Sequence, residues 1–251
     1  MKRLLLAAAL GLSLTVAAQA RSASIDSCGL ESDYEVSLDK SGLSFQHSGG
    51  KPASIVMNKG QLIVDGRLMT LSDTDRTRVA EYEATVRALV PQAKAIARDA
   101  IDIAFVAVSE VAAAFSGTAD SPSTRQRLGA VRSEIKQRID DAFEKKPWSE
   151  DEFDSLVEKA MSDLMPVILT EVAGNAVMIA LSGDEARAAE LERRAEKMEH
   201  DIERRIDTQT AQLASRVAAL CPMVARLDSL ENSLELRLDG GTRLNLLDYE
   251  K

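Results

Sequence analysis

The chain has 251 residues and a formal net charge of −9, from 40 acidic and 31 basic side chains. Charged residues make up 28% of it and hydrophobic residues 45%, which is typical of a folded protein and not of a disordered one. The acidic balance argues against nucleic acid as a partner, because such binding relies on clustered cations. The chain has only two His, two Cys and few aromatic residues, so it has few side chains that could form a transition-metal site, act in His-based catalysis or stack on bases.

The first twenty residues have the pattern of a secretory signal peptide. Lys2 and Arg3 precede an apolar run over 4–16, and Ala18-Gln19-Ala20 is the small-x-small motif of a cleavage site. We therefore predict cleavage before Arg21 and a periplasmic location, with a mature charge of −11 once the two cations are lost from −9. The apolar run is shorter than the roughly 20 residues that span a bilayer, so an uncleaved anchor is the less favoured alternative.

The only two cysteines, Cys28 and Cys221, lie near opposite ends of the predicted mature chain. An oxidising compartment favours their pairing, so we predict a disulfide that joins the two ends. The alternative is two separate buried thiols. A redox-active pair is less favoured, because such pairs are usually spaced as Cys-x-x-Cys.

Residues 21–71 are predicted to form a small antiparallel meander of four or five strands. Tyr34, Val36 and Leu38 alternate with polar residues, and the alternation resumes after a predicted turn at 39–42. Further along, Asn58-Lys59-Gly60 and Asp65-Gly66 supply the positive-φ positions that tight hairpin turns need.

From Ser72 the apolar spacing changes to threes and fours, which predicts a helix as far as Phe115, kinked or divided at Pro91. A second helix is predicted from Ser121 and Pro122 to Lys145-Lys146. The third begins at a capping box with a hydrophobic staple and runs to Leu181; its signature residues are Trp148, Ser149, Glu152 and Phe153.

A fourth helix, from about Asp184 to Leu220, has an apolar stripe and opposite faces rich in Glu and Arg. The stripe does not sustain a heptad, which suits a bundle better than a two-stranded coiled coil. Pro222 is predicted to end this helix. Leu234–Leu238 and Thr242–Leu246 then alternate around Asp239-Gly240-Gly241, which predicts a C-terminal hairpin.

The predicted fold class is therefore α+β, mainly α: a long-helix antiparallel bundle with an N-terminal antiparallel meander and a C-terminal β-hairpin. The predicted parts are a signal peptide over 1–20, a meander over 21–71, a bundle over 72–222 and a hairpin tail over 223–251. If the two cysteines pair, the tail is expected to pack near the N-terminal sheet.

The chain resembles the YggN-like family of secreted proteobacterial proteins. The resemblance lies in the signal peptide, in the strand-and-turn run from Ser54 to Ser72, and in the start of the following helix. It also lies at the two cysteines. The matching residues are Cys28, Asp75-Arg76, Tyr82, Arg87-Ala88-Leu89, Pro91, Cys221, Val224 and Leu227-Asp228-Ser229. The resemblance implies a compartment and a fold plan, and it brings no catalytic residues with it.

Four polar residues stand out because they interrupt apolar helices: Asp102, Glu110, Glu171 and Asn175. The favoured interpretation is that they lie on solvent-facing stripes, as every bundle helix needs. The alternative is a polar pocket inside the bundle, where a carboxyl group meets a ligand or an arginine. His47 and His200 are interpreted as an exposed turn residue and a member of a helical ion-pair ladder.

No catalytic, cofactor-binding or metal-binding constellation is recognisable in the sequence, so we expect a non-enzymatic protein without a cofactor. The first hypothesis is a helical binding or scaffold module of the cell envelope. The alternative is a carrier that holds an apolar or amphipathic ligand between bundle and sheet. The expected partner is a protein or a lipid-like molecule of the envelope, with peripheral membrane contact allowed; the oligomeric state is not predicted.

Overall fold

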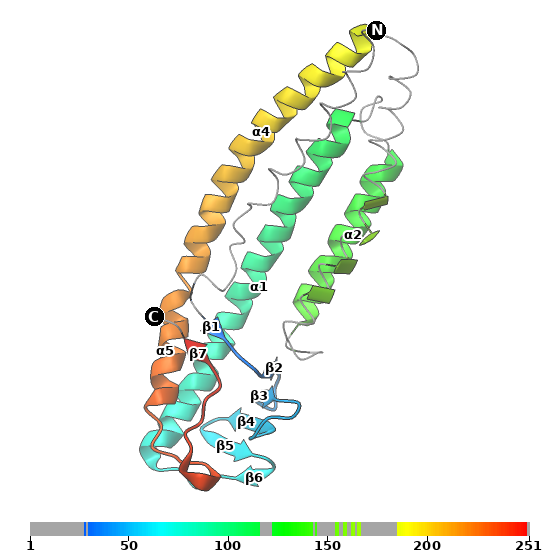
Figure 1. Ribbon diagram of the computed structural model, residues 1–251. Coiled ribbons are helices and arrows are strands. Elements are labelled where there is room, and N and C mark those ends of the chain that lie inside the picture. The colour runs from blue at the N-terminus through cyan, green and yellow to red at the C-terminus, as the bar shows by residue number, and fades with distance from the viewer. Residues whose placement is uncertain are drawn as a thin grey trace, which may run out of the picture.

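A computed structural model describes residue 28, residues 30–115, 122–142 and 144, four residue pairs between 154 and 166, and residues 185–249. The described residues form a five-stranded antiparallel sheet beside long helices (Figure 1). The strands are β1 (Leu30–Glu31), β2 (Glu35–Leu38), β3 (Leu43–Gln46), β4 (Ser54–Asn58), β5 (Gln61–Val64), β6 (Arg67–Leu68) and β7 (Asp248–Tyr249). The helices are α1 (Asp73–Phe115), α2 (Pro122–Asp141), α4 (Glu185–Ala218), α5 (Cys221–Asn232) and the 3₁₀ turn η3 (Asp239–Gly241). The chain is thus mainly helical, as predicted.

The sheet is a meander in the order β2-β3-β4-β5-β6, which confirms the predicted antiparallel strands. Two-residue turns join β4 to β5 and β5 to β6, because Asn58 pairs with Gln61 and Val64 pairs with Arg67. All four turn residues have positive φ: Lys59, Gly60, Asp65 and Gly66. This is the geometry that the Asn-x-Gly and Asp-Gly signals predict. Gly60 is also needed for space, since a Cβ there would lie 2.8 Å from the carbonyl oxygen of Arg76 on α1.

One face of the sheet packs against the first half of α1. Alternate strand residues form two apolar rows across the sheet, Phe45-Ile55-Val64 and Leu43-Met57-Leu62. All are almost fully buried, and they share a core with α1, α5 and the C-terminal tail. The helix and tail residues of this core are Val79, Tyr82, Val86, Val90, Leu227, Leu230, Leu234, Leu244, Leu246 and Leu247. We call this unit, residues 30–92 with 221–249, the head.

A second, smaller core lies further along α1, between α1 and α2. Its buried members are Phe105, Leu128, Ile135 and Ile139. We call α2, α4 and residues 93–115 of α1 the arm. Figure 1 shows α1 and α4 running side by side well beyond the sheet, with α2 on the other side of α1.

Pro91 does not divide α1, which runs through it as one helix of 43 residues. Pro91 is exposed, so its ring lies on the solvent side of α1, and the helix continues despite the one hydrogen bond that a proline removes. Pro122 begins α2 as predicted, although α2 ends at Asp141, before the predicted Lys145. The third predicted helix, 148–181, lies outside the described residues apart from the short pairs between 154 and 166, which are mostly helical.

The predicted fourth helix corresponds to α4, which ends at Ala218, two residues before the predicted Leu220. A short helix that the sequence analysis does not predict, α5, follows it, and Pro222 lies in the first turn of α5, where a missing N–H costs little. The predicted C-terminal hairpin is not confirmed. The tail from Leu234 to Leu246 turns through η3 but forms no strand ladder within itself. Its backbone N–H groups at Glu235, Leu236 and Leu246 donate to helix carboxylates and not to a partner strand.

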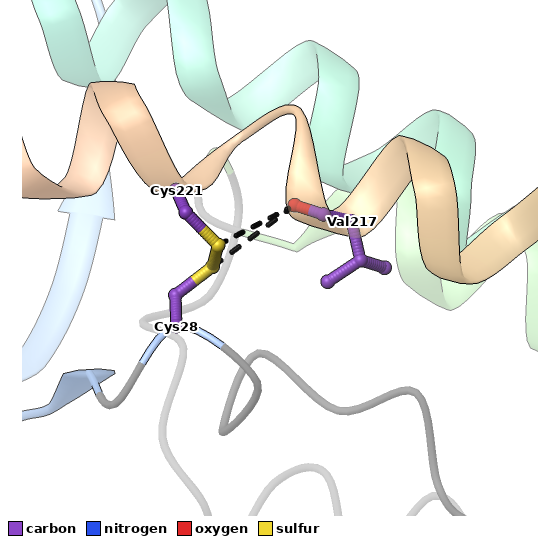
Figure 2. Close-up of a disulfide and its surroundings, with 3 residues drawn as sticks. All are labelled: Cys28, Val217 and Cys221. Carbon is purple, nitrogen blue, oxygen red and sulfur yellow. Dashed lines mark hydrogen bonds between the residues drawn. A yellow bond between two sulfur atoms is a disulfide. The ribbon is translucent and has the colours of Figure 1, made fainter.

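The two ends of the described chain meet. β7 pairs with β1 in a two-stranded antiparallel ladder, with Leu30 opposite Tyr249 and Glu31 opposite Asp248. Next to it, the predicted disulfide joins Cys28 to Cys221 (Figure 2). Among the described residues, no helix combines the length and apolarity needed to cross a membrane.

Candidate functional site

Three buried carboxylates are the titratable side chains that most resemble catalytic groups in the head. The exposed fraction is 2% for Asp75, 5% for Glu83 and 6% for Glu231. Buried carboxylates are costly unless they are paired, and catalytic sites often contain them, so each needs an account of its partners.

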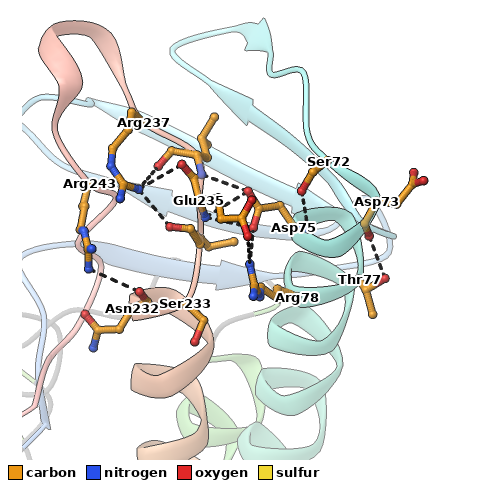
Figure 3. Close-up of polar contacts among 12 residues, drawn as sticks. Ser72, Asp73, Asp75, Thr77, Arg78, Asn232, Ser233, Glu235, Arg237 and Arg243 are labelled. Atoms are coloured by element: carbon orange, nitrogen blue, oxygen red, sulfur yellow. Dashed lines mark hydrogen bonds and ion pairs between the residues drawn. The ribbon is translucent and has the colours of Figure 1, made fainter.

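Asp75 binds the C-terminal tail. Its carboxylate accepts hydrogen bonds from the backbone N–H groups of Glu235 at 3.1 Å and Leu236 at 3.0 Å (Figure 3). Arg78, one turn along α1, donates a third at 2.9 Å. Burial alone would raise the pKa of Asp75, but these hydrogen bonds outweigh it and hold the pKa below its ordinary value.

The position of Asp75 follows from the start of α1. The Oγ of Ser72 accepts the backbone N–H of Asp75 at 3.0 Å, which makes Ser72 the N-cap and Asp75 the third helical residue. In a capping box the third residue reaches back to the N-cap. Here its carboxylate binds the tail instead, 160 residues away in sequence.

Glu83 binds the β4–β5 turn. Its Oε2 accepts the backbone N–H of Lys59 at 2.6 Å, and its Oε1 accepts two hydrogen bonds from Arg87 at 2.7 and 2.9 Å. Arg87 also donates to the carbonyl oxygen of Asp39 in the β2–β3 turn at 2.8 Å. Glu83 and Arg87 therefore attach two turns of the sheet to α1.

Glu231, at the end of α5, binds the tail a second time. Its Oε1 accepts the backbone N–H of Leu246 at 2.8 Å. Tyr82 lies nearby in the same core, and burial, with smaller contributions from the charges of Glu231 and Asp228, raises its pKa well above the ordinary value.

The three carboxylates thus share one role: each accepts backbone N–H groups from a segment distant in sequence. A general base works best with a pKa near the working pH, whereas the pKa of Asp75 is lowered. Together with Arg87, the three carboxylates attach the β2–β3 turn, the β4–β5 turn and the C-terminal tail to α1 and α5.

The alkaline side of the stability profile should report on Tyr82. Because its pKa is raised in the folded state, the unfolded chain releases the proton first as pH rises. Its contribution to the free energy of unfolding is therefore complete below pH 10 and decreases above pH 10. At pH 11 the loss is about 1 kcal/mol. We expect the free energy of unfolding, measured with urea at pH 8 and pH 11, to fall less in Tyr82→Phe than in the parent. Equal losses in both proteins would contradict this.

In the arm, the polar residues that interrupt α1 pair with neighbouring helices. Asp102 receives Lys136 and Arg132 of α2, the latter at 2.6 Å. Burial alone would raise the pKa of Asp102, but the hydrogen bonds from Lys136 and Arg132 leave it lowered. Glu110 pairs with Arg205 of α4 at 2.8 Å. Asp102 and Glu110 therefore bind different helices. Glu171 and Asn175 lie outside the described residues, so the polar pocket stays a prediction.

The pairs between α1 and α2 form a regular antiparallel ladder. Lys94, Arg98 and Asp102 pair with Glu144, Asp140 and Lys136, respectively. Each step of four residues up α1 therefore meets a step of four down α2 and the residues just after it, since Glu144 lies beyond the end of α2 at Asp141. Along α1 the charges are positive at Lys94 and Arg98 and negative at Asp102, and each opposite residue carries the reverse charge. A shift of one helical turn in either direction would place one pair of like charges together, so the ladder favours the observed register.

A double-mutant cycle should detect this ladder. Asp102→Lys places three cations together and is expected to cost about 1–2 kcal/mol, whereas Lys136→Asp in the same chain restores part of the loss. We expect a coupling of about 1 kcal/mol from urea unfolding of the two single variants and the double variant. Reversal of Glu134 and Arg138, an exposed pair within α2, is the control and should couple by less than about 0.5 kcal/mol.

The two histidines have other surroundings. The ring of His47 packs edge-on against Tyr34, with 5.2 Å between centroids, and its backbone N–H donates to Ala53. His200 is exposed on α4. In the part of the chain that the structure describes, no three His, Cys, Asp or Glu side chains gather as a metal ion would require.

Comparison with known proteins returns one match. The family described as "Protein of unknown function (DUF2884)" matches residues 28–247. No curated protein and no solved structure matches the chain. The match begins at Cys28 and extends through the buried tail, so it covers the arm and all of the head except β7.

Proposed function

The chain belongs to the DUF2884 family, and we propose that it is a non-enzymatic protein of the cell envelope whose arm binds a partner protein. The observation that carries this proposal is the single helix α1, which enters both cores. Val79, Tyr82 and Val86 of α1 lie in the head core, while Phe105 lies in the arm core. One unbroken helix, about 65 Å long at 1.5 Å per residue, therefore holds the arm at a fixed distance from the head.

The non-enzymatic part of the proposal rests on what the buried carboxylates bind. Asp75, Glu83 and Glu231 are engaged by backbone N–H groups, and Asp75 and Glu83 also by arginines. Groups used in this way hold loops and are not placed to transfer protons to a substrate.

The envelope location rests on the signal-peptide pattern and on the disulfide. Disulfides persist in oxidising compartments such as the bacterial periplasm, and the structure contains one between Cys28 and Cys221. The YggN-like resemblance implies the same compartment. The intact mass of the protein purified from its native cells tests this: we expect a chain beginning at Arg21, and a chain that still carries residues 1–20 would contradict cleavage.

The binding role is tested by site-specific photocrosslinking in intact cells. A photoreactive residue replaces Lys197 or Arg204, which are exposed on α4, or Lys40 or Lys51, which are exposed on the head. We expect one discrete adduct, of the same mass, from both arm positions and none from the head positions. Adducts of equal yield from arm and head, or none from either position on α4, would contradict binding through the arm.

The same samples separate a protein partner from a lipid-like one. Mass spectrometry of the adduct should show peptides of another protein joined to α4. A mass gain in the lipid range, with no second protein, would instead favour the carrier hypothesis over the binding module.

A further inference from the structure

The helices α4 and α5 follow one another along the chain and are separated by two residues, Ala219 and Leu220. α4 ends at Ala218 and α5 begins at Cys221. Pro222 has no N–H group, so it cannot donate to the carbonyl oxygen of Ala218, four residues earlier. At this point the backbone makes a hydrogen bond over three residues and not four: the N–H of Leu220 donates to the carbonyl oxygen of Val217 at 2.9 Å. We call residues 218–222 the joint.

The two sides of the joint belong to different parts of the molecule. Leu227 and Leu230 of α5 lie in the head core, whereas neither core of the described residues includes a residue of α4. Near the joint, Leu213, Val217 and Leu220 are buried. Two ion pairs also attach α4 to α1: Arg216 with Asp99 close to the joint, and Arg205 with Glu110 three turns further along α4.

The two ion pairs between α4 and α1 are expected to contribute little to stability. All four side chains of the two ion pairs are more than 40% exposed, and exposed pairs contribute little to stability. Between them on α4, the Oε1 atom of Gln209 is buried with no hydrogen-bond partner among the described residues. An unpaired buried carbonyl oxygen opposes the closed arrangement and favours exposure to water.

The disulfide lies on the joint. Cys221 is the first residue of α5, and Cys28 leads directly to β1, which pairs with β7 in the head. Figure 2 shows both sulfur atoms against the carbonyl oxygen of Val217, in the last turn of α4, at 4.0 and 3.9 Å. The bond therefore holds the joint against the N-terminal strand of the head.

We propose that the Cys28–Cys221 disulfide is a redox lock on this joint, and that its reduction lets α4 separate from α1 while the head stays folded. The disulfide removes freedom at the one place where the α4–α5 backbone is interrupted. Among the described side chains, the contacts of α4 with α1 include buried Leu213 and Val217 near the joint and, further along α4, the exposed ion pair of Arg205 with Glu110. The inference goes beyond the proposed binding role and stands whether or not α4 has a partner.

The reductant is a dithiol. Cys28 is 6% exposed, while Cys221 is half-buried, so a thiolate attacks the sulfur of Cys221. The disulfide breaks, a mixed disulfide forms on Cys221, and Cys28 leaves as a thiolate that takes up a proton. The second thiol of the reductant then attacks the mixed disulfide, loses its proton and releases Cys221. The protein gains two electrons and two protons, and the reductant becomes a disulfide.

Hydrogen exchange followed by mass spectrometry tests the lock on the full chain, oxidised and in dithiothreitol. At labelling times too short for global unfolding, we expect exchange to rise on reduction by about tenfold or more in peptides of α4, with β3, β4, β5 and α5 still protected. The variant with both cysteines replaced by serine should match the reduced protein with or without dithiothreitol. Unchanged exchange in α4, or an equal rise in α4 and the sheet, overturns the proposal.

A second variant tests the joint itself. Pro222→Ala restores the N–H donor to Ala218, so α4 and α5 can continue as one helix. In this variant we expect the effect of reduction on α4 to fall to less than about threefold. Pro91→Ala, an exposed proline inside α1, is the matched control and should respond to reduction like the parent. A response of Pro222→Ala as large as that of the parent overturns the assignment of the joint.

Discussion

Replacement of Asp75 by alanine is expected to lower the free energy of unfolding by about 3–5 kcal/mol. The side chain is 2% exposed and accepts the backbone N–H groups of Glu235 and Leu236. Its loss leaves these two N–H donors without their acceptor and removes the nearer of the two carboxylate partners of Arg78. Urea unfolding followed by circular dichroism, on the oxidised protein, measures the change.

Asp73→Ala is the matched control. Asp73 lies in the same first turn of α1 but is exposed, so it shares the helix-dipole interaction and lacks the tail contacts. We expect it to cost less than about 1 kcal/mol. Equal losses in Asp73→Ala and Asp75→Ala would mean that the hydrogen bonds to the tail do not stabilise the fold.

The cost of Asp75→Ala should also depend on pH. The pKa of Asp75 is lowered in the folded state from 3.8, so its contribution is complete above that value and is lost as pH falls below it. The unfolding free energies of parent and variant should therefore differ by a constant amount near neutral pH and converge below pH 3.8. A difference that stays constant to pH 2 would contradict the role of the charge.

The sheet was predictable because its signals are local. Alternation such as Tyr34-Val36-Leu38 needs only neighbouring residues, and positive φ at Asp65-Gly66 follows from the residue types. The tail was mispredicted for the opposite reason. The alternation of Leu234, Leu236 and Leu238 does place apolar residues toward the core, but the backbone partners are carboxylates on α1 and α5.

The distinction between local and long-range signals also explains which polar residues the sequence analysis singles out and which it misses. Asp102 and Glu110 attract notice because they interrupt an apolar helix, although their cationic partners come from α2 and α4. Asp75, Glu83 and Glu231 lie among other charged residues and look like an ordinary solvated face. Their burial depends on segments 15 to 161 residues away, so no local pattern marks them. The one local signal is Ser72, which places Asp75 in the first turn of α1.

Replacement of Cys28 and Cys221 together by serine is expected to lower the free energy of unfolding by about 3–5 kcal/mol. The two residues are 193 apart, so the bond closes nearly the whole described chain into a loop. In the chain-entropy treatment, a loop of this length removes about 5 kcal/mol of freedom from the unfolded state. Urea unfolding of the parent in dithiothreitol should give the same loss, and the double variant should not respond to dithiothreitol.

A loss below about 1 kcal/mol would mean that the disulfide does not restrict the unfolded chain. This expected loss of stability is separate from the proposed lock on the joint. The loss arises because the disulfide restricts the unfolded chain, whereas the lock restricts α4 in the folded protein. Pro222→Ala distinguishes the two: it leaves the loop length, and so the loss of stability on reduction, nearly unchanged, while it suppresses the exchange response of α4. If both responses disappear together in Pro222→Ala, the disulfide has one effect and not two.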